Sequence, residues 1–211
     1  MIKFAQLPLS LLIATVILAA CQPKNTADHA ALKESVVKNY GEIVHASYED
    51  AYNEAVKLQT AIDNLVATPD ANTFAAAKTA WINSREPYGQ TEAYRFYDGP
   101  IDDEDGPEGN INAWPLDENY VDYVNISTEE GVMLTGIVND VDNYPNITAE
   151  VLKAANEQGG EKNVSIGYHA IEFLLWGQDF MDVNTNLGQG GDRSFTDYTP
   201  EAPNHIRRGA Y

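Results

Sequence analysis

The sequence is poor in cysteine and in basic residues. Cys21 is the only cysteine among 211 residues, so an internal disulfide is excluded and the fold has to be stabilised by packing. Lysine and arginine number 13 against 32 aspartates and glutamates, which gives a formal net charge of −19. Because such a surface repels phosphate backbones, nucleic acid is not expected as a partner. The acidic surface is that of a soluble exported protein or, alternatively, one that attracts cations.

Strand patterns and the common catalytic motifs are also absent. No stretch of useful length alternates apolar and polar residues as a half-buried strand does. The sequence has no His-Glu-x-x-His zinc motif, no phosphate-binding glycine loop and no serine nucleophile elbow. The acidic run that ends at Gly106 does not match an EF-hand, because Ile101 and Asn112 stand where that calcium loop requires acids.

The first residues predict export and lipidation. Lys3 precedes an apolar stretch that ends in Leu18-Ala-Ala-Cys21, and this pattern resembles the lipobox of bacterial lipoproteins. We therefore expect a signal peptide over 1–20, and a lipid anchor on Cys21 with a polar tether over 21–29. An ordinary signal peptide that ends near Cys21 is the alternative. Gln22 in the second mature position favours the outer membrane, so we expect a cell-envelope protein that faces the periplasm.

The rest of the chain predicts an all-α fold. Apolar residues recur at intervals of three and four from Val44 to Leu65, and Pro87 is expected to kink the second helix. We expect helices over 30–67, 70–94, 127–138, 148–156 and 164–176. The architecture is then a helical bundle with a long first helix and an ordered irregular loop region near 101–124. It forms one domain over 30–179, followed by an irregular tail over 180–211.

The helix expected over 164–176 places a histidine and a carboxylate on one stripe. Ser165, His169, Glu172 and Trp176 follow each other at spacings of four, three and four, while most neighbouring residues are apolar. Burying such polar groups without partners costs roughly 2 to 7 kcal/mol. The pattern therefore indicates either a structural pair with satisfied hydrogen bonds or a pair that binds a metal.

A second polar stripe lies on the helix expected over 70–94. Trp81, Arg85, Tyr88, Glu92 and Arg95 follow a similar rhythm, although the kink at the intervening proline makes their phase uncertain. Taken alone, this pattern fits a surface helix with Arg/Glu pairs.

Three motifs resemble the imelysin family. Gly167-Tyr-His169-Ala-Ile-Glu172 is similar to its Gly-x-His-x-x-Glu signature, and the segment from Arg85 to Asp102 is similar to its other characteristic stretch. Gly109-Asn-Ile-Asn-Ala-Trp-Pro115 also fits. The resemblance implies an all-α fold and a bacterial exported or lipid-anchored protein linked to iron uptake. Because members usually carry a second bundle after the His/Glu motif, we expect this chain to be the N-terminal half of an imelysin.

The resemblance implies a metal role for His169 and Glu172. Imidazole with carboxylate suits iron or zinc better than calcium. A possible additional site comprises Arg85, Glu86, Glu92 and Arg95, in which the arginines pair with carboxylates or hold an anionic chelator. The expected partners are a metal ion or metal chelate and, through the lipid, the membrane. A metallopeptidase is the enzymatic alternative, and a purely structural helical module is the third.

Overall fold

A computed structural model describes residues 26–127, 131–178, 191 and 193–211. The predicted signal peptide and Cys21 lie outside these residues. The chain comprises two compact units, 1–45 and 46–211. The described part of the first unit is the beginning of the 42-residue helix α2 (Thr26–Ala67), whose side chains there are mostly exposed. None of the described helices has the length and apolar character needed to cross a membrane.

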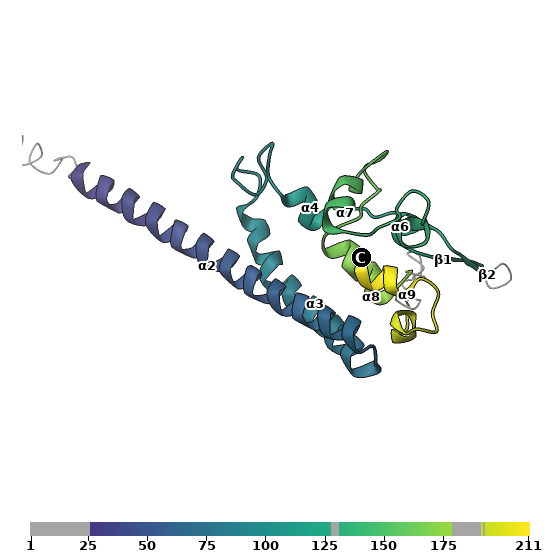
Figure 1. Cartoon of the computed structure of the whole chain (residues 1–211). Helices are drawn as coiled ribbons and strands as arrows, with labels where there is room; N and C mark the ends of the chain where they lie inside the picture. Colours follow the sequence, from purple (N-terminus) through teal and green to yellow (C-terminus); the bar gives the residue numbers. More distant parts are fainter. Residues whose placement is uncertain (1–25, 128–130, 179–190, 192) are drawn as a thin grey trace, which may run out of the picture. The chain divides into compact units, whose positions relative to one another are not determined.

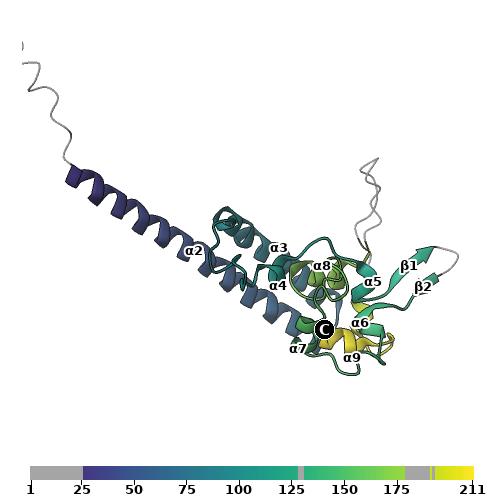
Figure 2. The ribbon, with the colours of Figure 1, turned by 90° about the horizontal axis from the view of Figure 1, so that it is seen from above.

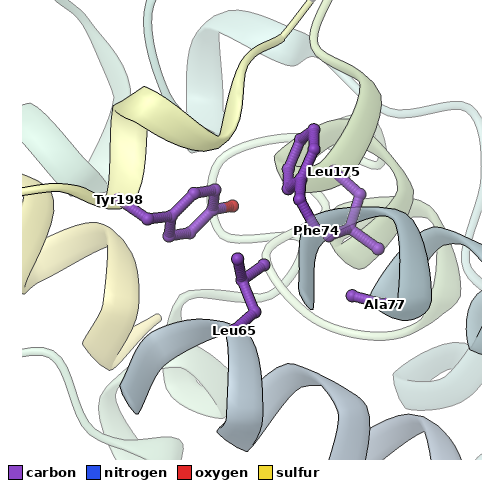
Figure 3. Close-up of a cluster of buried hydrophobic side chains, with 5 residues drawn as sticks. All are labelled: Leu65, Phe74, Ala77, Leu175 and Tyr198. Atoms are coloured by element: carbon purple, nitrogen blue, oxygen red, sulfur yellow. The ribbon is translucent and has the colours of Figure 1, made fainter. Parts of the chain in front are cut away.

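In the second unit, the end of α2 packs against α3 (Ala71–Thr91). Asp70 begins α3 by accepting hydrogen bonds from the backbone N–H groups of the second and third helical residues, as an N-cap does. The predicted apolar face of α2 is confirmed, and three of its members, Ala51, Leu58 and Leu65, are buried. Figure 3 shows one core cluster, formed by Leu65, Phe74, Ala77, Leu175 and Tyr198. The long first helix and the all-α fold class are therefore as predicted.

The end of α3 and the following loop differ from one continuous helix. After α3, which contains Pro87, the chain forms a turn of 3-10 helix, η1 (Glu92–Tyr94). Two short helices follow in the region that the sequence marked as irregular, α4 (Glu108–Asn112) and α5 (Glu118–Val121).

A small β-hairpin replaces the predicted helix over 127–138. Strands β1 (Val124–Ser127) and β2 (Gly131–Met133) pair antiparallel, and a helical segment, α6 (Gly136–Asn139), follows only after them. Gly136 has a φ of 79°, and a Cβ there would lie 2.4 Å from the carbonyl carbon of Val121. A residue in that conformation can begin a helix but does not lie inside a continuous one, and strands precede it, so the prediction of one helix over 127–138 is wrong.

Two further helices lead to the predicted His/Glu motif. Thr148 caps α7 (Ala149–Ala155) by accepting from the N–H of Val151, which confirms the predicted start. The next helix, α8 (Tyr168–Trp176), begins four residues later than predicted. Its apolar residues Ala170, Phe173, Leu174 and Leu175 are buried.

The C-terminal residues pack on the domain and do not form an irregular tail beyond it. From 193 onward the chain contains η2 (Phe195–Tyr198) and α9 (His205–Ala210). Tyr198 belongs to the core, and α9 lies close to α6 in both views (Figure 1, Figure 2), where Arg207 donates hydrogen bonds to the carbonyls of the α6 residues Ile137 and Val138. The part of the expected tail that the structure describes is thus ordered, because its side chains find partners on distant segments.

Candidate functional site

His169 and Glu172 lie side by side on α8. His169 Nδ1 is 3.1 Å from Glu172 Oε2, a hydrogen-bond distance. The two side chains are 21% and 43% exposed, so the expectation that this pair is buried is wrong. The neighbouring residues Ala170 and Phe173 lie on the buried side of α8. Because the pair reaches solvent, it avoids most of the desolvation cost that a core position would impose.

The pair opens onto a cavity of about 360 Å³. The segment that joins α4 to α5 forms one wall with Trp114 and Leu116, and α8 forms the other with the pair and Trp176. Among the described residues that line this cavity, Glu118, which makes its own contacts, is the third acidic or imidazole side chain. Within the described residues, no three His, Cys, Asp or Glu side chains gather closely enough to form a metal site. The site is therefore a pair of donors in a hollow and not a closed cage.

Gly167 and Trp81 fix where α8 begins. Gly167 has a φ of 87°, and a Cβ on it would lie 2.5 Å from the carbonyl oxygen of Ile111. Only glycine fits this conformation and this close approach. Trp81 of α3 donates from Nε1 to the carbonyl oxygen of Tyr168 at 2.9 Å, and its ring packs edge-on against Trp176. The glycine of the Gly-x-His-x-x-Glu motif is thus a structural requirement for presenting His169.

The predicted helical stripe that included Ser165 does not form. Ser165 precedes α8 and is fully buried, where its hydroxyl donates to the carbonyl of Leu152 at 2.7 Å. Trp176 does line the cavity with the His/Glu pair. The other three residues of the predicted stripe, His169, Glu172 and Trp176, lie on α8 and line the same cavity, whereas Ser165 does not belong to the helix.

Arg85 occupies an aromatic environment on α3. Its Nη1 donates to Asn112 Oδ1 at 2.7 Å, and its guanidinium carbon lies 4.9 Å from the ring centroid of Tyr168 and 5.4 Å from that of Tyr88. It makes no ion pair with any acidic side chain that the structure describes. The expected pairing of Arg85 with a carboxylate is therefore not observed.

Arg95 does pair with carboxylates. Its Nη1 lies 3.2 Å from Glu92 Oε1 and 2.8 Å from Glu108 Oε1. Burial by itself lowers the pKa of Arg95, but the charge of Glu108 and the contacts with Glu92 outweigh it and raise the pKa overall. Glu86 is exposed and lines a different surface hollow, together with Asp50. The four residues of the possible additional site thus form no single cluster.

Sequence reasoning missed a buried ionic cluster. Asp122 accepts hydrogen bonds from Arg193 at 2.7 Å and from Arg208 at 2.6 Å, and all three side chains are almost completely buried. The guanidinium of Arg193 also lies 4.6 Å from the ring centroid of Tyr123, whose hydroxyl donates to Asp197 at 2.6 Å. Arg193 lies 71 positions from Asp122 in the chain, and Arg208 lies 86 positions from it. Because local spacing does not relate residues so far apart, no sequence pattern predicted this cluster.

Comparison with known proteins identifies the family of this chain. The family model described as Imelysin matches residues 44–210, and the chain therefore belongs to the imelysin family. A curated relative, iron-regulated protein A of Synechococcus elongatus, is 34% identical over 76 residues, which cover 36% of this chain and 20% of that protein. The matched part thus spans one fifth of the relative's length.

Proposed function

We propose that this chain binds iron or a related divalent metal such as zinc through His169 and Glu172. In this proposal it is a lipid-anchored protein of the cell envelope and takes part in iron uptake. Membership of the imelysin family and the similarity to a protein named for its regulation by iron support an iron-related role. The separation of the two side chains is the structural observation that carries the metal assignment.

The His/Glu pair fits one edge of a metal coordination sphere. Two ligand atoms that each lie about 2.1 Å from one metal ion, at angles of about 90 to 110°, are roughly 3.0 to 3.4 Å apart. His169 Nδ1 and Glu172 Oε2 are 3.1 Å apart without rearrangement. Nitrogen with oxygen is a donor set that suits iron or zinc, whereas calcium prefers oxygen alone. To act as a ligand, the imidazole nitrogen has to be deprotonated, so metal binding would release any proton that it carries.

The cavity leaves room for the remaining ligands. With two protein donors in a space of about 360 Å³, water or the donor groups of a chelator would complete the coordination. Trp114, which is 73% exposed, stands at this cavity and offers a flat apolar surface to a bound chelate. The ligand is therefore a hydrated metal ion or a metal chelate.

Metal titration of the purified protein tests this proposal. Isothermal calorimetry with iron(II) under anaerobic conditions, and separately with zinc(II), should show binding by the wild type and none by His169→Leu/Glu172→Met. Because the pair is partly exposed, the free energy of unfolding of the double variant, measured in urea, should differ from that of the wild type by less than about 1 kcal/mol. The matched control is His45→Leu/Glu49→Met, which removes an exposed His/Glu pair from α2 and should leave binding unchanged. Equal binding by the wild type and the site variant would refute the site.

A second assay tests whether the protein is instead a metallopeptidase. Hydrolytic zinc sites commonly use two or three histidines, whereas His169 is the one histidine at this cavity among the described residues. Metal-loaded protein should therefore cleave unfolded protein substrates no faster than His169→Ala does. Metal-dependent cleavage that this substitution abolishes would make peptidase activity the better assignment.

A further inference from the structure

A second cavity lies beside α8 and is separate from the metal cavity. It measures about 530 Å³, within the range of about 300 to 1,000 Å³ that is usual for small-molecule sites. Its walls include Tyr48, Tyr52, Tyr88 and Tyr168, together with Leu58 and Ile171, and we call it the tyrosine pocket. Within α8, Tyr168 and Ile171 face this pocket, whereas His169 and Glu172 face the other cavity.

The tyrosine pocket is uncharged. No Asp, Glu, Lys, Arg or His is among its described lining residues, although the chain carries 45 acidic and basic side chains. Its polar side chains are the tyrosine phenols and the amides of Gln59 and Asn110. The guanidinium of Arg85 packs against the rings of Tyr168 and Tyr88 but does not line the pocket. A charged ligand would therefore lose its hydration without direct contact with an opposite charge, whereas an uncharged apolar ligand would gain by burial.

Two tyrosine hydroxyls in this wall have no hydrogen-bond partner among the residues that the structure describes. Tyr88 and Tyr168 are each 6% exposed, and their ring centroids are 5.0 Å apart. Neither phenol forms a hydrogen bond with any residue that the structure describes, whereas the buried phenol of Tyr198 donates to the carbonyl of Leu174. Neither phenol oxygen is among the described buried polar atoms that lack a partner, so both hydroxyls are accessible to solvent and are available to a ligand in the pocket.

The Tyr88 phenol remains a donor at physiological pH. Burial raises its pKa, and the negative charges of Glu108 and Glu92 add to the rise. A phenol in this state keeps its proton and donates to an acceptor such as a carbonyl oxygen.

We propose that the tyrosine pocket binds an uncharged, lipophilic small molecule that carries a hydrogen-bond acceptor, such as a ketone or an ester. The apolar body of the ligand packs against Leu58 and Ile171, and its acceptor bonds to the phenol of Tyr88 or Tyr168. This pocket is distinct from the metal cavity, because no described residue lines both.

A fluorescence titration with N-phenyl-1-naphthylamine, an uncharged apolar dye, tests the pocket. Ala55 lines the pocket, so Ala55→Phe should fill it and weaken dye binding at least tenfold. Ala67→Phe is the matched control, because it makes the same change at an exposed position of the same helix and should alter affinity less than twofold. Circular dichroism verifies that both variants fold.

Displacement of the dye tests the chemistry of the ligand. 2-Undecanone should displace it, and decanoate, an anion with a comparable chain, should do so at least tenfold less well. Tyr88→Phe and Tyr168→Phe keep the rings and remove the hydroxyls, so the double variant should bind the dye within twofold of wild type and the ketone about three- to tenfold more weakly.

Four results would overturn the proposal. These are no dye binding by the wild type, unchanged binding by Ala55→Phe, decanoate displacing as well as the ketone, and unchanged ketone affinity in the double phenylalanine variant. Sedimentation at the assay concentration also tests whether the protein forms a dimer. A dimer that Ala55→Phe dissociates would show that the face joins two copies of the chain and not a small molecule.

Discussion

Arg208 Nε donates a hydrogen bond of 2.6 Å to Asp122 Oδ2, although 86 positions separate the two residues. Both side chains are almost fully buried. The contact ties α9 to the turn between α5 and β1, and Arg193 joins it from a third segment with a hydrogen bond to the same carboxylate oxygen. This cluster explains why the C-terminal residues are part of the domain.

Asp122→Asn should destabilise the protein strongly. The substitution removes the buried negative charge and leaves Arg193 and Arg208 without compensation, for which we expect a loss of roughly 3 to 5 kcal/mol in the free energy of unfolding. Urea denaturation measures it. Asp105→Asn, at an exposed position, should change the value by less than about 0.5 kcal/mol. Equal stability of the two variants would contradict the role assigned to the cluster.

The same carboxylate should make stability depend on acid pH. Burial by itself raises the pKa of Asp122, but the hydrogen bond from Arg208 and the charges of Arg193 and Arg208 outweigh it and hold the pKa below its usual value. The stabilisation is therefore complete above the unfolded pKa of about 3.9 and is lost as the pH falls through the lower folded pKa. Unfolding free energies at several pH values below about 5 should decline more steeply for wild type than for Asp122→Asn. Parallel declines would show that other carboxylates account for the acid sensitivity.

Gly167→Ala should disturb the presentation of the His/Glu pair. A Cβ at this position meets the carbonyl of Ile111, and the residue keeps a positive φ, so we expect a loss of at least about 2 kcal/mol in stability. Gly160→Ala is the control, because its Cβ would meet nothing closer than 3.9 Å and its φ is not in the left-handed region. Thermal melts compare the two variants, and an undisturbed Gly167→Ala protein would remove the structural reason for this glycine.

Cys21→Ser tests the predicted anchor. If Cys21 carries the lipid, the variant should move from the membrane fraction to the soluble periplasmic fraction after cell lysis, which immunoblotting of both fractions measures. Ser10→Ala, a substitution within the predicted signal peptide that keeps Cys21, should leave the distribution as in wild type. Unchanged membrane retention of Cys21→Ser would rule out the lipoprotein assignment.

Local patterns determined much of the fold. The spacing of apolar residues predicted the buried face of α2, and the capping residue Thr148 predicted the start of α7, because both effects act between neighbours within a few positions. The Gly-x-His-x-x-Glu motif also placed His169 and Glu172 together, since residues three apart in a helix adjoin. The resemblance of its motifs indicated the imelysin family.

The tertiary structure decided what covers each element. The approach of the Ile111 carbonyl to Gly167 leaves no room for a side chain at the start of α8, and the predicted buried pair of His169 and Glu172 is partly exposed at a cavity. The pairing of Asp122 with Arg208 and the opening of two cavities on different sides of α8 depend on segments far apart in the chain. Periodicity shows which residues share a face, but burial and long-range ion pairs depend on which distant segment packs against that face, and no local spacing encodes that choice.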